Sequence, residues 1–457
     1  ALDNLCAIVD VNRLGQSDPT MLQHDMEAYR ARWAGFGWHA IVVDGHDIGA
    51  LVAAFEEAAR TKGRPTVLLA KTFKGRGISF MENHPEWHGK PMKKGEETQK
   101  ALDELTRQLK PGSTQPQIPT PTAVKAAAPA KGTMAPPPYK LGDSAATREA
   151  FGAALLALGE ANSQVVALDA DVKNSTYSDK FGKRFPDRFL ENFIAEQNML
   201  GAAAGIAACG KIPFVATFAA FFTRAYDFIR MAAISQSNIK LVGTHVGVSI
   251  GEDGPSQMGL EDLAMMRAMP NMVVLSPCDS YELRSCLHWM AEYEGPVYMQ
   301  LIRPKQPQVF DYSYKFNPDK AVVLHEGTDV TLVSTGYMTP FALRAADEVK
   351  ANGLSVEVLH YPCVKPFDAK TLVASAKKTG AVVTVETQNI IGGLGSAVCE
   401  VLSESHPTPV KRLGIPDKFG EVATEGYLFQ KHGFGLEHIK DACAKMATPA
   451  GATIPRS

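Results

Sequence analysis

A carboxylate and a group of aromatic residues stand in one stretch of the sequence, residues 192–230, NFIAEQNMLGAAAGIAACGKIPFVATFAAFFTRAYDFIR. Glu196 follows a short apolar run, and Phe218 and Phe221 stand at the end of a second one. A strand, a small-residue helix and a second strand predict a parallel βαβ unit. Glu196 and Phe218 are then expected at carboxyl ends of strands, where open α/β sheets bind ligands. The plainer interpretation is that Glu196 complements a helix N-terminus and the phenylalanines are core.

Three polar residues nearer the start of the chain have ordinary interpretations when taken singly. Asn12 follows the first strand-like run in VNRLGQSD, a position where Asn is most often a turn residue. Lys74 lies in KTFKGRGISF, which a solvated basic loop would explain, and His88 is a lone loop histidine in EWHGKP. None of the three indicates a site by itself.

The amino-acid sequences of several segments resemble those of the transketolase family, whose members use thiamine diphosphate. These segments are NLCAIVDVNRLGQSDP from Asn4, AKTFKGRGISF, WHGKP, EQNM, TFAAFFTRA, HVGVSIGEDGPSQMGLEDLAMMRAMPN and the GGLG near residue 394. They are spread over nearly the whole chain, so the resemblance does not depend on one motif. It implies an enzyme that transfers a two-carbon glycolaldehyde unit from a ketose phosphate to an aldose phosphate in the pentose phosphate pathway.

The resemblance also assigns roles to individual residues. Glu196 would hydrogen-bond the aminopyrimidine ring of the cofactor, and burial beside Phe218 and Phe221 would favour its protonated form. His245 and His88 are the other implied catalytic residues. The implied cofactor-binding residues are Asn12, Leu14, Lys74, His88, Asp171, Glu196, Phe218, Phe221 and Gln257. The implied sugar-phosphate residues are Arg148, Ser175, His245, Asp253, Arg303 and His88.

The resemblance to the transketolase family also implies a divalent metal. The side-chain oxygen of Asn12 and the backbone carbonyl of Leu14 would bind Mg²⁺ or Ca²⁺, which prefer such hard oxygen ligands. The sequence departs from the family here, because only 11 residues precede Asn12 and none form the family's Gly-Asp-Gly motif. We therefore expect a missing front half. We also expect weak cofactor binding by this chain alone, restored by that segment either fused or as a separate chain.

Other interpretations stay open at this stage. A deoxyxylulose-phosphate synthase, or the decarboxylating subunit of a 2-oxoacid dehydrogenase, would share the glutamate. A non-catalytic transketolase-like protein, or one part of a split enzyme, is the alternative from another class. The resemblance further implies a homodimer, with each cofactor held between the diphosphate-binding domain of one subunit and the pyrimidine-binding domain of the other.

Composition limits the class of protein. The 457 residues carry a formal net charge of -2, which gives no electrostatic reason to expect nucleic acid or an anionic membrane as partner. No apolar run approaches the ~18 residues that span a bilayer. The seven cysteines are scattered without a CxxC pair, which favours reduced thiols in the cytoplasm.

The order of strand-like and helix-like runs predicts an α/β protein with two doubly wound parallel-sheet domains, the first of them incomplete, and a smaller C-terminal α/β domain. Residues 1–110 would hold the diphosphate-binding part and residues 140–312 the pyrimidine-binding domain with six strands. Residues 313–457 would form the C-terminal domain, to which we assign no chemistry; GGLG is interpreted as the first turn of a helix. Between the first two domains, residues 111–139 predict a linker, since eight of the 29 prolines lie between Pro111 and Pro138.

Overall fold

The computed structural model describes residues 2–110, 112, 118, 120, 132–140 and 142–447. The chain divides into two compact units, Ala1–Val124 and Lys125–Ser457, and each is described here by itself. Most of the predicted proline-rich linker lies outside the described residues. No helix in the described part of the chain combines the length and the apolar character needed to cross a membrane.

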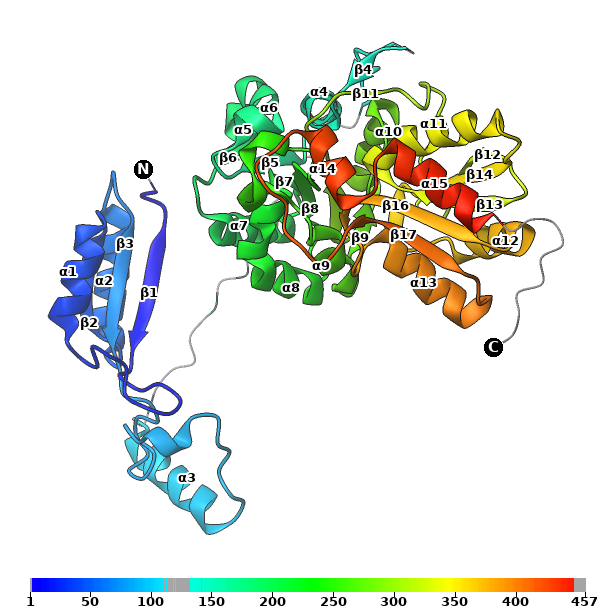
Figure 1. Cartoon of the computed structure of the whole chain (residues 1–457). Coiled ribbons are helices and arrows are strands. Elements are labelled where there is room, and N and C mark those ends of the chain that lie inside the picture. The colour runs from blue at the N-terminus through cyan, green and yellow to red at the C-terminus, as the bar shows by residue number, and fades with distance from the viewer. Residues whose placement is uncertain are drawn as a thin grey trace. The chain divides into compact units, whose positions relative to one another are not determined.

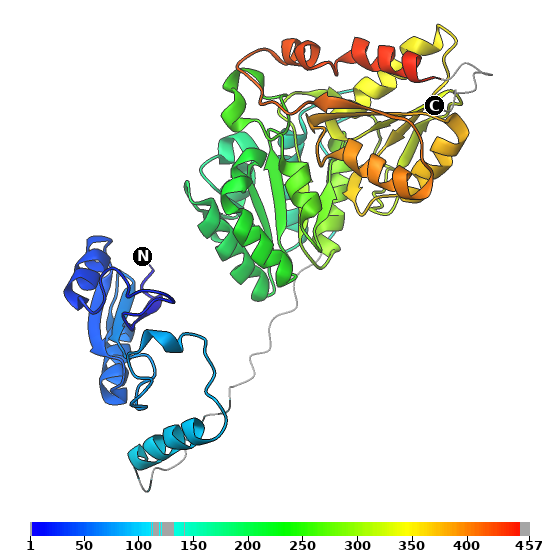
Figure 2. The same ribbon diagram turned by 60° about the horizontal axis from the view of Figure 1, so that its bottom comes forward.

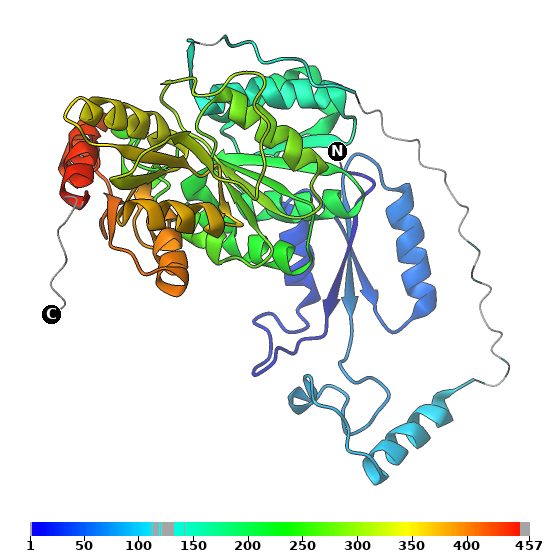
Figure 3. The same ribbon diagram turned by 90° about the vertical axis from the view of Figure 1, so that its right-hand side faces the viewer.

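The first unit is a three-stranded parallel sheet with the strand order β1-β3-β2. Its two crossover helices lie on opposite sides of the strands (Figure 3). This βαβαβ arrangement confirms the prediction for the start of the chain. The elements are β1 (Cys6–Val11), α1 (Met26–Gly35), β2 (His39–Asp44), α2 (Ile48–Arg60), β3 (Thr66–Lys71) and, beyond the sheet, α3 (Glu96–Gln108).

Local chemistry defines the helices of this unit. The Asp47 side chain accepts a hydrogen bond from the backbone N–H of Ala50 and so caps the N-terminus of α2. Ala54 and Ala58, one helical turn apart, face the sheet and are buried. Asp25 caps α1 in the same way, accepting from the N–H of Ala28.

A seven-stranded sheet forms the centre of the second unit, in the order β15-β9-β10-β8-β7-β5-β6 (Figure 1). The six strands predicted for this region are all present and parallel: β5 (Val165–Asp169), β6 (Phe189–Glu191), β7 (Ile212–Phe218), β8 (Lys240–Thr244), β9 (Val273–Leu275) and β10 (Val297–Gln300). The seventh, β15 (Cys363–Lys365), comes from much later in the chain and pairs with β9 in the antiparallel direction.

Helices cover both faces of this sheet, each over its own apolar cluster. One face carries α4 (Thr147–Ala161), α6 (Asp179–Arg184) and α10 (Ser280–Glu292). The other carries α7 (Glu196–Ala208), α8 (Tyr226–Ile234) and α9 (Asp262–Ala268). The doubly wound fold expected from the sequence is therefore present.

The end of the chain forms a second, mixed sheet in the order β12-β14-β13-β16-β17. Helices α11 (Thr339–Lys350) and α15 (Leu436–Met446) pack on one face, and α12 (Ala369–Thr379) and α13 (Leu394–Ser405) on the other (Figure 2). The strands are β12 (Val322–His325), β13 (Val330–Ser334), β14 (Val356–His360), β16 (Val382–Asn389) and β17 (Val410–Ile415), and a further helix, α14, spans Glu425–His432.

The GGLG segment opens α13, as predicted. Gly393 is the N-cap residue, and the backbone N–H groups of Leu394 and Gly395 donate to the buried carboxylate of Glu386, each over 2.8 Å. The free N–H groups of the first helical turn are thus satisfied from within the protein.

A buried ion pair joins the two sheets of the second unit. Glu282 of α10 and His360 at the end of β14 approach to 2.8 Å, and both side chains are 0% exposed. Glu282 also accepts hydrogen bonds from the N–H of Cys278 and the hydroxyl of Tyr314, each over 2.7 Å. Burial acts to raise the pKa of Glu282, but the facing His360 and these hydrogen bonds outweigh it and lower that pKa.

Candidate active site

Glu196 is the first residue of α7, directly after the loop that follows β6. Its side chain is only 4% exposed, and its Oε2 atom accepts a hydrogen bond from Nη1 of Arg224 over 3.1 Å. The helix N-terminus and the guanidinium both stabilise negative charge at this carboxylate.

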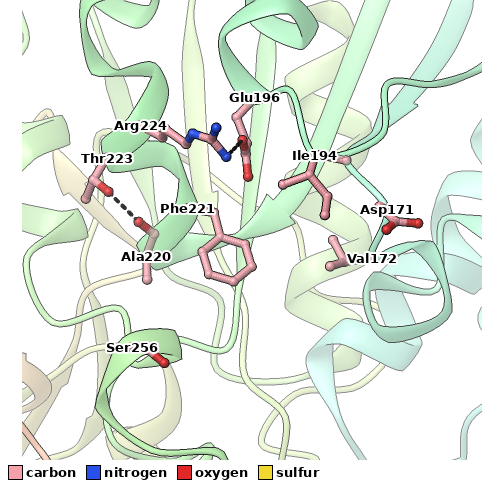
Figure 4. A pocket seen from close by; sticks show the side chains of 10 residues that line it. Asp171, Val172, Ile194, Glu196, Ala220, Phe221, Thr223, Arg224 and Ser256 are labelled. Carbon is pink, nitrogen blue, oxygen red and sulfur yellow. Dashed lines mark hydrogen bonds and ion pairs between the residues drawn. The ribbon is translucent and has the colours of Figure 1, made fainter.

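A pocket of about 530 Å³ opens beside Glu196. Figure 4 shows the Glu196 carboxylate and the Phe221 ring directed toward the same space, with Arg224 above and Val172 and Ile194 at the side. The lining residues are Ala170, Asp171, Val172, Ile194, Glu196, Ala220, Phe221, Thr223, Arg224 and Ser256. The site therefore combines one buried carboxylate with apolar and aromatic walls.

Aromatic contacts connect this pocket to a second polar cluster. Phe218, at the end of β7, stacks on Phe221 with ring centroids 5.0 Å apart. The other neighbour of Phe218 is the ring of His245, at 3.8 Å. His245 follows β8 directly, so the two neighbouring strands deliver both rings to the same edge of the sheet.

His245 is held in an unusual backbone conformation and is almost fully buried. Its φ angle is 61°, in the left-handed region that non-glycine residues seldom occupy. Its Nδ1 atom lies 2.8 Å from the Thr244 hydroxyl and its Nε2 atom 3.4 Å from Nη1 of Arg148. Burial, together with Arg148 and Arg303, lowers the pKa of His245 to about 3, so the ring is neutral at physiological pH.

Two arginines lie beside this histidine. Arg148, in the first turn of α4, donates to the backbone carbonyl of Ser175 over 3.0 Å, and burial lowers its pKa. Arg303 donates to Asp253 over 3.0 Å and to the carbonyl of Ile250 over 3.2 Å. The second unit thus brings Arg148, Ser175, His245, Asp253 and Arg303 together, although they are spread over more than 150 positions of the sequence.

The neutral state of His245 predicts a measurable acid sensitivity. The folded pKa of about 3 lies below the ordinary value of 6.5, so the unfolded chain binds the extra proton between these two pH values. Stability is then greatest above pH 6.5 and falls as the pH decreases toward 3. Urea unfolding of wild type should lose about 1.5 kcal/mol more than His245→Asn between pH 6.5 and 5. Equal losses in the two proteins would contradict a buried neutral His245.

Asp171 and Gln257 stand at the margins of the pocket. Asp171 has a positive φ of 62°, and its backbone N–H donates to Glu191 over 3.0 Å, which fixes the turn after β5. Its exposed carboxylate lines the pocket wall. Gln257 is half-buried at the end of a short 3₁₀ turn, Pro255–Gln257, next to the lining residue Ser256.

The first unit holds the remaining predicted residues. The side-chain oxygen of Asn12 accepts a hydrogen bond from the N–H of Leu14 over 3.0 Å, closing the turn after β1. Lys74 and His88 are brought together, since Nζ of the lysine lies 2.8 Å from Nδ1 of the histidine. These residues form two local pairs within this unit.

Comparisons with known proteins identify the three parts of the chain. Family models match residues 1–110 (transketolase, thiamine diphosphate binding domain), 143–308 (transketolase, pyrimidine binding domain) and 319–439 (transketolase, C-terminal domain). The chain is 45% identical to transketolase of Homo sapiens over 458 residues, covering 98% of this chain and 72% of that protein. The chain belongs to the transketolase family.

Solved structures of the transketolase family agree with the fold. A split gene transketolase, described as an inactive β4 tetramer, is 44% identical with a TM-score of 0.61, and the match covers 66% of this chain and 98% of that one. The transketolase of Campylobacter jejuni matches 97% of this chain and 73% of its own length, with a TM-score of 0.76 and 21% identity. That second likeness shows the fold alone.

Several residues of this transketolase-family site were not predicted from the sequence. Arg224 pairs with Glu196, and Thr223, Ile194 and Ser256 line the pocket. Arg224 stands inside the TFAAFFTRA motif, so a signal was present, but an arginine in a loop is ordinarily a solvated charge. Its contact with a glutamate 28 positions earlier becomes visible only in three dimensions.

Proposed function

We propose that this protein is a thiamine-diphosphate-dependent transketolase, transferring a two-carbon glycolaldehyde unit from a ketose phosphate to an aldose phosphate. The observation that carries the proposal is the continuous path from Glu196 through Phe221, Phe218 and His245 to Arg148. It links a buried carboxylate in an apolar pocket to a cationic cluster suited to a phosphate.

The donor set of the pocket fits the aminopyrimidine end of the cofactor. The Glu196 carboxylate would hold a proton on an Oε atom against a ring nitrogen, and Phe221 would pack on the ring face. Thiamine diphosphate, when bound, would supply the electron sink for the transferred two-carbon unit.

The polar cluster would bind the sugar phosphate. The guanidinium groups of Arg148 and Arg303 suit a phosphate, and Asp253 would accept a hydrogen bond from a substrate hydroxyl. His245, neutral at physiological pH, could accept or donate a proton at a ring nitrogen next to the reacting carbonyl. His88 and Lys74, paired in the first unit, would act at the diphosphate and the donor sugar.

The proposal includes a divalent metal and a second copy of the chain. The Asn12 side chain and the Leu14 carbonyl offer neutral hard oxygens of the kind that Mg²⁺ and Ca²⁺ bind. Ile194, which lines the pocket of the second unit, and its chain neighbour Phe193 are 66% and 70% exposed, which supports a protein contact there. Full activity in a monomer at high dilution, measured by sedimentation and assay together, would contradict the homodimer.

The alternatives differ in the substrate that they need. A deoxyxylulose-phosphate synthase or a 2-oxoacid dehydrogenase subunit would consume a 2-oxoacid, whereas a transketolase takes its two-carbon unit from a ketose phosphate. The decisive experiment measures ketol transfer between a ketose phosphate and an aldose phosphate, with and without thiamine diphosphate and Mg²⁺. A further arm adds a chain that supplies the family's Gly-Asp-Gly segment. Activity only in that arm would indicate one part of a split enzyme, and no activity in any arm would favour a non-catalytic protein.

Arg303 gives a separate prediction for the phosphate end. Arg303→Ala should raise KM for phosphorylated substrates about tenfold while leaving kcat within about twofold, because it removes binding that is equal in ground and transition states. Arg344→Ala, which removes an exposed arginine paired with Glu348, is the matched control and should leave KM unchanged. An unchanged KM in Arg303→Ala would remove this residue from the proposed site.

A further inference from the structure

Three side chains of the kinds that bind metals meet between the two sheets of the second unit. The Sγ atom of Cys278, a carboxylate oxygen of Glu282 and a ring nitrogen of His360 all lie within 4.8 Å of one another. All three residues are 0% exposed. Among the residues that the structure describes, this is the one group of its kind. The buried ion pair of Glu282 and His360 thus has a thiol as its third member.

The start of α10 places Cys278 beside Glu282. Asp279 is the N-cap residue, and its side chain accepts a hydrogen bond from the backbone N–H of Glu282 over 2.8 Å. In return, Oε2 of Glu282 accepts from the backbone N–H of Cys278 over 2.7 Å. This reciprocal pattern is similar to a capping box. It turns the chain before the helix back over the first helical turn, so residues four positions apart share one place.

A chain of hydroxyl groups behind His360 fixes the direction of its ring. Nδ1 lies 2.8 Å from Oγ1 of Thr339, which lies 3.1 Å from Oγ of Ser334. The Ser334 hydroxyl donates to the backbone carbonyl of Leu359 over 3.4 Å. When Nδ1 donates to Thr339 and Thr339 to Ser334, every hydroxyl has a partner and Nε2 directs a lone pair toward Glu282. Hydrogen bonds of this kind from the second ring nitrogen orient metal-binding histidines.

The carboxylate of Glu282 is held as firmly as the ring. Its Oε1 atom accepts a hydrogen bond from the Tyr314 hydroxyl over 2.7 Å, while Oε2 lies 2.8 Å from Nε2 of His360. Two lone pairs at that distance repel each other unless a positive charge lies between them. In the metal-free protein that charge is a proton, which gives the ion pair described above. A metal ion takes the same place when the Cys278 sulfur joins as a ligand.

The donor set selects the metal. Sulfur, imidazole nitrogen and carboxylate oxygen together suit Zn²⁺, whereas Mg²⁺ and Ca²⁺ prefer oxygen ligands alone. Ligand atoms around a tetrahedral zinc lie about 3–4 Å apart, so small side-chain rotations close the observed group onto one ion. A thiolate and a carboxylate also neutralise the two charges of the ion, which a site without water contact requires.

We propose that Cys278, Glu282 and His360 bind a structural Zn²⁺ ion that fastens the C-terminal sheet to the pyrimidine-binding domain. One water molecule enclosed with the ion would be the fourth ligand. Cys278 and Glu282 belong to the start of α10 on the large sheet, and His360 ends β14 of the second sheet. None of the three lines the pocket beside Glu196, so the inference does not depend on the proposed transfer reaction.

Binding of the ion displaces a proton from the thiol. Burial, followed by the charges of Glu282 and Asp279, raises the pKa of Cys278, so the metal-free protein holds this thiol protonated. The sulfur gives its proton to solvent as the bond to zinc forms, and Nε2 of His360 binds as neutral imidazole. Because the site has no exposed atom path at its ligands, the ion is expected to enter while the chain folds.

Metal content of the full chain is the first test. Protein produced in zinc-containing medium and passed over a chelating resin should retain about one zinc per chain by elemental analysis, and Cys278→Ser at most about 0.1. Cys286→Ser is the matched control, because Cys286 lies on the same helix, is also 0% exposed and stands outside the group. It should retain as much zinc as wild type.

Cobalt identifies the ligands directly. The chain produced with Co²⁺ in place of zinc should show the d–d absorption of tetrahedral cobalt and a thiolate-to-cobalt charge-transfer band in the near ultraviolet. Cys278→Ser should lose the charge-transfer band, and Cys286→Ser should keep it. This readout separates a site at Cys278 from ions held by exposed histidines elsewhere.

Calorimetric melting tests the fastening role. Zinc-loaded wild type should melt at least about 5 °C above wild type produced in zinc-depleted medium, because the ion binds only the folded chain. His360→Asn should remove this difference, since it takes away the ligand that the second sheet supplies. An equal melting temperature in loaded and metal-free wild type would overturn the fastening role.

The site itself would be overturned by less than about 0.1 zinc per chain in wild type, by equal zinc in wild type and Cys278→Ser, or by cobalt without the thiolate band. If Cys278→Ser does not fold, Glu282→Gln applies the same zinc criterion. Its amide oxygen still accepts from the Tyr314 hydroxyl, but an uncharged amide is a poor ligand for zinc. Full zinc content in Glu282→Gln would then count against the proposal.

Discussion

Replacing Glu196 by glutamine is expected to lower kcat by at least about 100-fold while cofactor binding stays within a few-fold of wild type. The amide has nearly the same shape, but it cannot hold and release the proton that the proposed reaction requires at this atom. General acid–base groups typically contribute factors of about 10² to 10⁴, so the loss should fall within that range. It should appear in kcat rather than KM.

The measurement pairs steady-state kinetics with calorimetric titration of thiamine diphosphate. Glu160→Gln serves as the matched control, because that carboxylate pairs with Arg184 on an exposed surface. Wild-type turnover in Glu196→Gln would show that the carboxylate is not the proton-holding group. Loss of cofactor binding in this variant would show that the carboxylate is needed to bind the cofactor and not only for turnover.

The buried pair of Glu282 and His360 gives the largest expected effect on stability. His360→Ala should lower the free energy of unfolding by about 3–5 kcal/mol, because it leaves a buried carboxylate without the partner that faces it. Both side chains are 0% exposed, so bulk water does not solvate the carboxylate in the folded protein. Equilibrium unfolding in guanidinium, followed by circular dichroism, measures the change.

Two companion variants separate charge from packing. The double variant Glu282→Leu/His360→Phe removes both charges and should recover at least half of the loss, since apolar replacement of a buried pair is often neutral. Arg344→Ala breaks an exposed pair with Glu348 and should cost less than about 1 kcal/mol. A loss below 1 kcal/mol in His360→Ala would mean that the pair is not a significant link between the sheets.

Much of the fold could be predicted from local pattern. The apolar runs of residues 140–312 give all six parallel strands, because buried strands read as continuous apolar segments. The segment IGALVAAFEEAAR forms a helix at Ile48–Arg60, where an Asp cap and buried alanines one turn apart agree. In contrast, β15 is three residues long and pairs with a strand nearly ninety positions earlier, so no local signal could reveal it.

The residues of the candidate site also fall into two groups: those that a local motif indicates, and those whose role depends on the fold. The motifs supplied Glu196, Phe218 and Phe221, which the structure brings to one pocket edge. They could not supply Arg224's contact with Glu196, because that contact depends on how distant elements pack. An arginine is mostly solvent-exposed, and Arg224 is itself 56% exposed, so only its contact with the buried Glu196 distinguishes it from an ordinary surface charge.

The antiparallel pairing of β15 with β9 limits how this protein can be divided. A truncated polypeptide ending before Cys363 would leave the backbone N–H and C=O groups of β9 uncovered at the margin of the large sheet. An unpaired edge strand of this kind can pair with strands of other chains and so promote aggregation. Exchange of the C-terminal sheet with that of a relative would have to carry a compatible three-residue strand with it. The pyrimidine-binding and C-terminal regions should therefore be kept together in one polypeptide when the protein is expressed or engineered.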